Sequence, residues 1–167
     1  MYKGILLILF LVVHTSAFAG KVSEFFSDGA FGVQWGDTLE EVRKSHPEGS
    51  IAEYAGIKNY IIPHSKPILK IARDDTDITF TFNSLGKLHA IGVSFEGNEF
   101  GEVYTTLKTY FGDHEPHSNS MRLDWPEDEG IKMYLVSLPT GFSIKPMLTI
   151  ENVSPAGDGS KEDLGLN

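Results

Sequence analysis

The chain has 167 residues, with 14 basic and 23 acidic side chains, a formal net charge of −9 and no cysteine. The lack of cysteine excludes disulfides, thiol catalysis and thiolate metal sites. The acidic balance, with no run of basic residues, argues against nucleic acid as a partner, because phosphate binding depends on Lys and Arg.

The N-terminus has the three parts of a cleavable signal peptide. Lys3 supplies the positive charge, Ile5–Val13 is an unbroken apolar run, and Ala17-Phe18-Ala19 is a small-x-small cleavage site. The run is shorter than the roughly 20 residues of a membrane-spanning helix, although a retained anchor helix is the alternative. We therefore expect residues 1–19 to be removed between Ala19 and Gly20, giving a periplasmic or secreted protein with no membrane span. Loss of Lys3 makes the formal charge −10.

The remaining 148 residues are near the commonest size of a single domain. We expect one domain over residues 20–153. From Ser154 the chain is polar and rich in glycine, with only Leu164 and Leu166 apolar. Such a segment buries too little apolar surface to offset its ordering entropy, so residues 154–167 are predicted to be a disordered tail.

In the first half, the pattern predicts a short extended segment at 31–35 and then one helix and four strands. Asp37 is the expected N-cap, with Glu40 three residues later, and the helix is expected to end before Pro47. The expected strands are Tyr60–Ile62, Ile68–Ala72, Asp77–Asn83 and Leu88–Glu96, the last two forming a hairpin.

In the second half, a helix is predicted from about Glu99 to Phe111, closed by Gly112. Its apolar residues recur at helical spacing and are expected to pack in the core. Three strands follow, around 121–125, 131–135 and 142–153, with a turn at 126–130. Pro146 suggests that the last strand lies at an edge or contains a bulge.

These elements predict an α+β domain, with two short helices packed on one face of an antiparallel sheet. The order of helix and meander occurs twice, which suggests an internal duplication. The other face of the sheet is expected to be partly exposed to water.

The segment Phe31-Gly-Val-Gln-Trp-Gly-Asp-Thr-Leu-Glu-Glu-Val42 resembles the opening of small exported bacterial domains of unassigned function. It is also similar to the helix start of the SmpA/OmlA outer-membrane assembly lipoproteins, although this chain lacks their lipid-anchoring cysteine. The repeated helix and meander resemble the architecture of β-lactamase-inhibitor-like proteins. The resemblance implies a protein-binding module of the cell envelope and transfers no catalytic residue.

Asp113-His114-Glu115-Pro116-His117 is a local cluster of metal-ligand residue types. His114 and His117 are therefore weak candidates for zinc or copper ligands, but their spacing matches no standard site, and a solvated loop is the simpler interpretation. The run at 74–77 resembles a fragment of a calcium loop without its Gly and distal Glu. We expect no cofactor.

No serine stands in a Gly-x-Ser-x-Gly elbow, and the sequence points to no paired carboxylates, so we expect no catalytic activity. Trp35 and Trp125 are either core residues or anchors for a partner at the rim of the sheet. The sequence favours a binding or assembly module that contacts an envelope or extracellular protein through the open sheet face. A carrier of a small ligand or metal, and an unrecognised hydrolase, are the alternatives.

Overall fold

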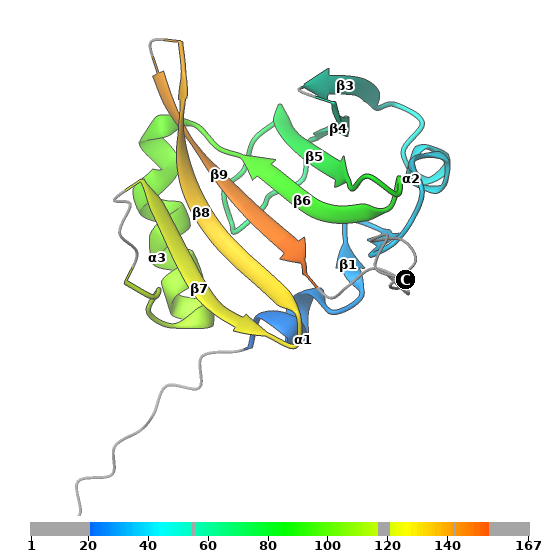
Figure 1. The fold of residues 1–167 in the computed structure, drawn as a ribbon. Helices are drawn as coiled ribbons and strands as arrows, with labels where there is room; N and C mark the ends of the chain where they lie inside the picture. The colour runs from blue at the N-terminus through cyan, green and yellow to red at the C-terminus, as the bar shows by residue number, and fades with distance from the viewer. Residues whose placement is uncertain (1–20, 55, 117–120, 142, 154–167) are drawn as a thin grey trace, which may run out of the picture.

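The computed structural model describes residues 21–54, 56–116, 121–141 and 143–153. The predicted signal peptide and the predicted tail therefore lie outside the described residues. The helices are α1 (Val22–Phe26), α2 (Leu39–Ser45), the 3-10 turn η1 (Gly97–Glu99) and α3 (Phe100–Phe111) (Figure 1). The strands are β1 (Gly29–Ala30), β2 (Val33–Gln34), β3 (Ser50–Tyr54), β4 (Ile57–His64), β5 (Thr76–Phe82), β6 (Leu88–Ser94), β7 (Arg122–Asp128), β8 (Ile131–Thr140) and β9 (Ser143–Asn152).

The main sheet has seven antiparallel strands in the order β3-β4-β5-β6-β9-β8-β7, and β1 and β2 form a separate two-stranded hairpin. Each half of the chain contributes a meander, and the two meanders join where β6 pairs with β9. The edges of the main sheet are consequently β3 and β7, which lie on opposite sides of the molecule (Figure 1). This mixed architecture, mostly sheet, agrees with the expected α+β class.

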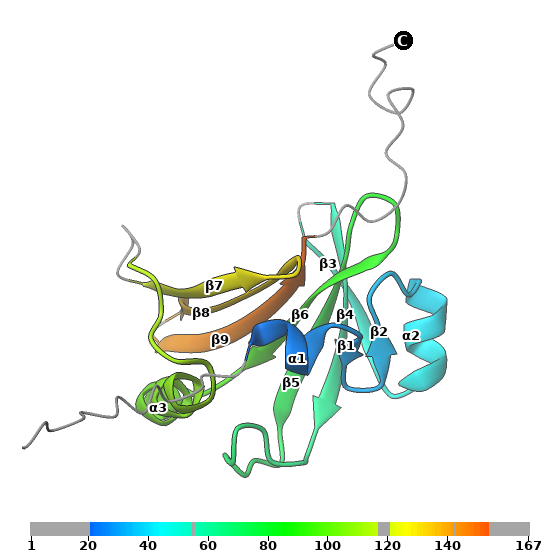
Figure 2. The ribbon, with the colours of Figure 1, turned by 90° about the horizontal axis from the view of Figure 1, so that it is seen from below.

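One face of the sheet carries the core because apolar side chains alternate along every central strand. A row of directly paired residues crosses β4, β5, β6, β9, β8 and β7, and every member is at most 2% exposed: Tyr60, Phe80, Ile91, Ile150, Met133 and Trp125. The helices contact this face, α3 through Val103 and Leu107 and α2 through Val42. In Figure 2, α3 lies below β7, β8 and β9, and α1, the β1–β2 hairpin and α2 follow one another toward the right of the view.

The hairpin of β5 and β6 and the long helix α3 were predicted, but the start of α2 was misplaced by one residue. Thr38, not Asp37, is the N-cap, and its hydroxyl accepts a hydrogen bond from the amide of Glu41 at 3.3 Å. The Glu41 carboxylate in turn accepts from the amide of Thr38 at 2.7 Å. Asp37 instead accepts from the amide of Gln34, which closes the turn before the helix.

The strand predicted at Ile68–Ala72 is wrong. The segment is a tight turn in which the amide of Ile68 donates to the carbonyl of Ile71 at 3.1 Å and the amide of Ile71 donates back at 2.9 Å. The two residues between them, Leu69 and Lys70, have left-handed backbone angles, with φ of 52° and 70°. A strand cannot contain such angles, so the apolar composition of this segment was misleading.

The second meander also differs in two details from the prediction. The turn expected at 126–130 is shorter, because β7 runs to Asp128 and only Glu129 and Gly130 separate it from β8. Pro146 lies in β9, an interior strand without a register shift against β8. It is tolerated because the paired register with β6 ends at Met147, so its missing N–H falls where that ladder ends.

Candidate functional site

An apolar groove lies between α1, α3 and the turn at 68–71. It is a hollow of about 360 Å³, and we call it the aromatic groove. Its floor is formed by Leu107 and Leu148, which belong to the buried core. Its walls are formed by Phe25, Phe26, Leu69, Lys70, Tyr110 and Phe111.

The aromatic side chains of the groove contact one another but stay partly open to solvent. Phe25 is 52% exposed and Tyr110 is 41% exposed. The ring of Phe25 meets that of Phe111 edge-on, with centroids 5.2 Å apart, and Phe26 stacks on Phe111 at 6.2 Å. Rings held in place by such contacts offer a large apolar surface at small entropic cost, which suits them to anchor a partner.

The third wall of the groove is held in an unfavourable backbone conformation. Leu69 and Lys70 occupy the left-handed region, which costs non-glycine residues about 1–3 kcal/mol each. The turn directs Leu69 into the groove and brings the ammonium group of Lys70 to 5.8 Å from the ring centre of Tyr110. Lys70 forms no ion pair with any residue that the structure describes.

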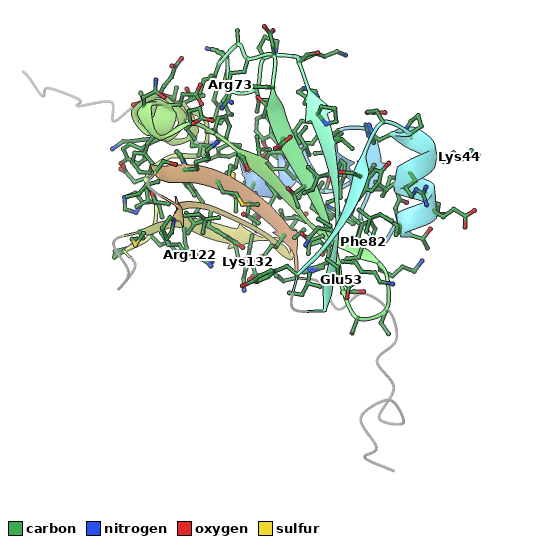
Figure 3. The ribbon with its side chains drawn as sticks, turned by 90° about the horizontal axis from the view of Figure 1, so that it is seen from above. Lys44, Glu53, Arg73, Phe82, Arg122 and Lys132 are labelled. Atoms are coloured by element: carbon green, nitrogen blue, oxygen red, sulfur yellow. The ribbon has the colours of Figure 1, made fainter. Side chains whose placement is uncertain are left out.

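An ion-pair network fixes the chain that follows this turn. The guanidinium of Arg73, which is 13% exposed, contacts the carboxylates of Asp75 at 2.9 Å and Glu99 at 3.1 Å. Glu96 joins Arg73 to Lys145 of β9, at 3.4 and 2.7 Å respectively. The hydrogen bond from Lys145 is the main cause that lowers the pKa of Glu96, and the pair with Arg73 adds to it. The network therefore ties the wall of the groove to η1 and β9. Arg73, its central residue, is labelled in Figure 3.

The open face of the sheet, where a protein contact was expected, carries a mostly polar row of paired residues. Its polar members alternate with the core residues along their strands: Asn59 on β4, Thr81 on β5, Glu151 on β9 and Lys132 on β8. Figure 3 shows Arg122 and Lys132 on this side of the sheet. Seven of the exposed large apolar residues in the described chain lie at three places: the aromatic groove (Phe25, Tyr110), β3 and the start of β4 (Ile51, Tyr54, Ile57), and the tip of β8 and β9 (Leu138, Ile144). Leu85, Met121 and Val153 lie apart from them.

Tyr134 is the centre of a packed polar cluster on this face. The Arg122 guanidinium lies 3.6 Å from the centre of the Tyr134 ring, and the Tyr134 hydroxyl donates to Glu151 at 2.5 Å. Burial, followed by the hydrogen bond to Glu151, raises the pKa of Tyr134 to about 12. Asp124 also pairs with Arg122. These groups bond one another, so we assign them a structural role.

Of the two candidate metal ligands, His117 lies outside the described residues. The His114 ring is half-buried between Tyr104 and Trp125, and its Nδ1 lies 2.9 Å from the carbonyl oxygen of Glu115. Among the described residues, no group of three or more His, Cys, Asp or Glu side chains could hold a metal ion.

The two tryptophans occupy core positions. Trp125 is 2% exposed, and its indole N–H donates to the carbonyl of Gly112 at 3.0 Å. Trp35 is half-buried between the two halves of the core, and its N–H donates to the carbonyl of Phe26 at 2.7 Å. Trp125 therefore fixes the end of α3 to the core, and Trp35 fixes the end of α1, next to the groove.

Sequence reasoning missed the aromatic groove. The helical spacing predicts Tyr110 and Phe111 in the buried stripe of α3, but only Val103 and Leu107 of this helix are buried. Two sequence features pointed to the groove: the adjacent pair Phe25 and Phe26, and the pair Tyr110 and Phe111 at the end of α3. No pattern joins them to Leu69, because the three segments meet only in the tertiary structure.

None of the described helices is long and apolar enough to cross a membrane. Comparisons with known proteins found no family model, no curated protein and no solved structure that matches this chain.

Proposed function

We propose that this protein is an exported, non-catalytic protein-binding module, and that its aromatic groove is the binding surface. The observation that carries the proposal is the open apolar hollow over Leu107 and Leu148, lined by half-exposed aromatic rings. Exposed aromatic residues beside a pocket are typical of the residues that dominate binding energy in protein interfaces.

The strained turn supports a role beyond folding. Residues in costly backbone conformations cluster at ligand clamps and binding sites, and here the strain places Leu69 and Lys70 on the rim. A partner segment with one or two large apolar side chains would fill the hollow. A carboxylate next to them would suit Lys70, which is the cation of this wall.

A carrier of a small apolar ligand is the second candidate for the same groove. Ligand sites usually bury 70–90% of a drug-sized molecule, but this groove stays open along Phe25 and Tyr110. The open shape favours a protein segment, which covers the rim as well as the floor. Native mass spectrometry of protein purified from its own organism separates the two, since a carrier retains a small molecule of defined mass.

The proposed envelope location rests on the signal-peptide pattern of residues 1–19 and on the resemblance to exported assembly proteins. The proposed duplication is supported by the topology, since each meander pairs with the other through its last strand, β6 or β9. Intact mass of the exported protein tests the location, with a mature chain starting at Gly20 expected. Recovery of the uncut chain from the membrane would contradict it.

The binding surface is tested by photo-crosslinking in the envelope fraction of the source organism. A photoreactive phenylalanine analogue at position 25 should capture a defined envelope protein. Tyr110→Asp should abolish this product, and Leu138→Asp, which alters an exposed leucine at the far tip of β8, should not. Capture that is unchanged by Tyr110→Asp would overturn the groove as the binding surface.

A further inference from the structure

The two edges of the main sheet differ in how they are protected from pairing with another strand. At β7, the amide of Glu115 donates to the carbonyl of Asp124 at 2.7 Å, so part of the edge is covered by the chain itself. Pro126 and a shift of register between Trp125 and Asp128 interrupt the rest. Covering loops, prolines and bulges are the usual means by which proteins block sheet edges.

The β3 edge has none of these devices. Its sequence, Ser-Ile-Ala-Glu-Tyr, contains no proline or lysine, and all five residues pair with β4 in continuous register. Among the described residues, no backbone hydrogen bond reaches its outer side. Exposed apolar residues lie in it and beside it: in β3, Ile51 is 53% and Tyr54 81% exposed, and in the neighbouring β4, Ile57 is 49% exposed. An unprotected apolar edge of this kind is a template for another strand.

Ile51 is also the uncovered end of the apolar row described above. It pairs with Tyr60, the first member of that row, so it stands on the core face of the sheet. Tyr60 is 1% exposed, and Trp125 at the far end of the row is 2% exposed. Both β3 and β7 are edges of the sheet, but only the β3 end of this row is open to solvent, since Ile51 is 53% exposed.

We propose that β3 pairs in antiparallel fashion with β3 of a second copy of this chain, with Ile51 on the two-fold axis. This register places Ile51 opposite its own counterpart and continues the apolar row into the second copy. Glu53 then lies opposite Gly49 of the second copy, and the two Glu53 side chains stand four residues apart along the paired strands. Like charges do not face each other in this arrangement, which is the condition for stable cross-strand pairs.

The two-fold registers centred on the next two residues of β3 are less favourable. Pairing centred on Ala52 places the charged Glu53 against the apolar Ile51, and pairing centred on Glu53 places two carboxylates directly opposite each other. The charge of β3 resides in Glu53 alone, which lies opposite Lys58 of its own β4 and is labelled in Figure 3. The pattern of β3 is therefore self-complementary about Ile51.

Sedimentation of the mature chain over a range of concentrations, at about 0.15 M salt to screen its net charge, tests the proposal. We expect a monomer–dimer equilibrium, and we expect Ile51→Lys to raise the dissociation constant at least about tenfold. Ile144→Lys is the matched control, since Ile144 is 55% exposed in β9 and lies away from β3. A monomer at all concentrations, or equal effects of the two variants, would overturn the proposal.

The register is tested separately, and the cysteine-free chain makes this test clean. Under mild oxidation, Ile51→Cys should form a covalent dimer, because opposite Cβ atoms in a strand pair lie about 4.5–5.5 Å apart. Glu53→Cys should form no covalent dimer, since its counterpart is four residues away along the paired strands. A dimer cross-linked through position 53 and not through position 51 would contradict the register.

Discussion

Ser23 donates both its backbone amide and its hydroxyl to the same carboxylate oxygen of Asp128, across 105 residues of sequence. The amide bond measures 3.2 Å. Ser23 is 5% exposed and lies in the first turn of α1, while Asp128 ends β7. The contact therefore attaches the N-terminal helix, and with it one wall of the aromatic groove, to the second meander.

Asp128→Asn is expected to lower the melting temperature by a few degrees at pH 7. The hydrogen bond from the Ser23 hydroxyl is the main cause that holds the pKa of Asp128 below its ordinary value. A carboxylate with a lowered folded pKa adds stability above its unfolded pKa of about 3.9, and this stability is lost as the pH falls through the folded pKa. The difference between variant and parent should therefore shrink in acid. Thermal unfolding of variant and parent at pH 7 and in acid measures this difference. Asp77→Asn, at an exposed position, is a control that should change the melting temperature little.

Leu107→Ala is expected to destabilise the domain by about 2–5 kcal/mol, since it removes a fully buried side chain and leaves a cavity. Thr105→Ala, on the exposed side of α3, should cost less than about 0.5 kcal/mol. Urea unfolding of both variants gives the comparison. Equal effects would contradict the packing of α3 against the sheet.

Lys70→Gly should leave the free energy of unfolding unchanged or raise it by up to about 1 kcal/mol. Glycine adopts the left-handed conformation without strain, which offsets its greater entropy in the unfolded chain. Lys66→Gly is the control, because Lys66 lacks a left-handed angle and should lose about 0.5–1 kcal/mol. Cross-linking from position 25 should nevertheless weaken in Lys70→Gly. A large loss of stability would show that the turn is not strained.

Glu151→Gln should lower the pKa of Tyr134 from about 12, because it removes the negative charge that opposes ionisation of the phenol. In the parent protein the raised pKa adds stability below the unfolded value of about 10, and that stability is lost as the pH rises through about 12. Ultraviolet titration of tyrosinate measures the shift, and Glu127→Gln serves as the control. An unchanged titration in Glu151→Gln would contradict the contact between Tyr134 and Glu151.

The elements that could be predicted from the amino-acid sequence are those whose apolar side chains repeat at a local period. Ile78, Phe80 and Phe82 alternate because every second residue of β5 faces the core, and all three are at most 4% exposed. Val103 and Leu107 fall on one face of α3 for the corresponding reason. The class of the fold and the β5–β6 hairpin followed from these patterns.

The surfaces that stay exposed depend on how distant segments pack together, which the local pattern does not show. The row that ends at Ile51 exists because six registers align residues from seven strands, and Ser50–Tyr54 carries too little alternation to predict β3 by itself. The aromatic groove joins Phe25, Leu69 and Tyr110, which are far apart in the chain. Local periodicity reports how a segment buries its own side chains, but contacts between distant segments depend on the packing of the whole sheet and its helices.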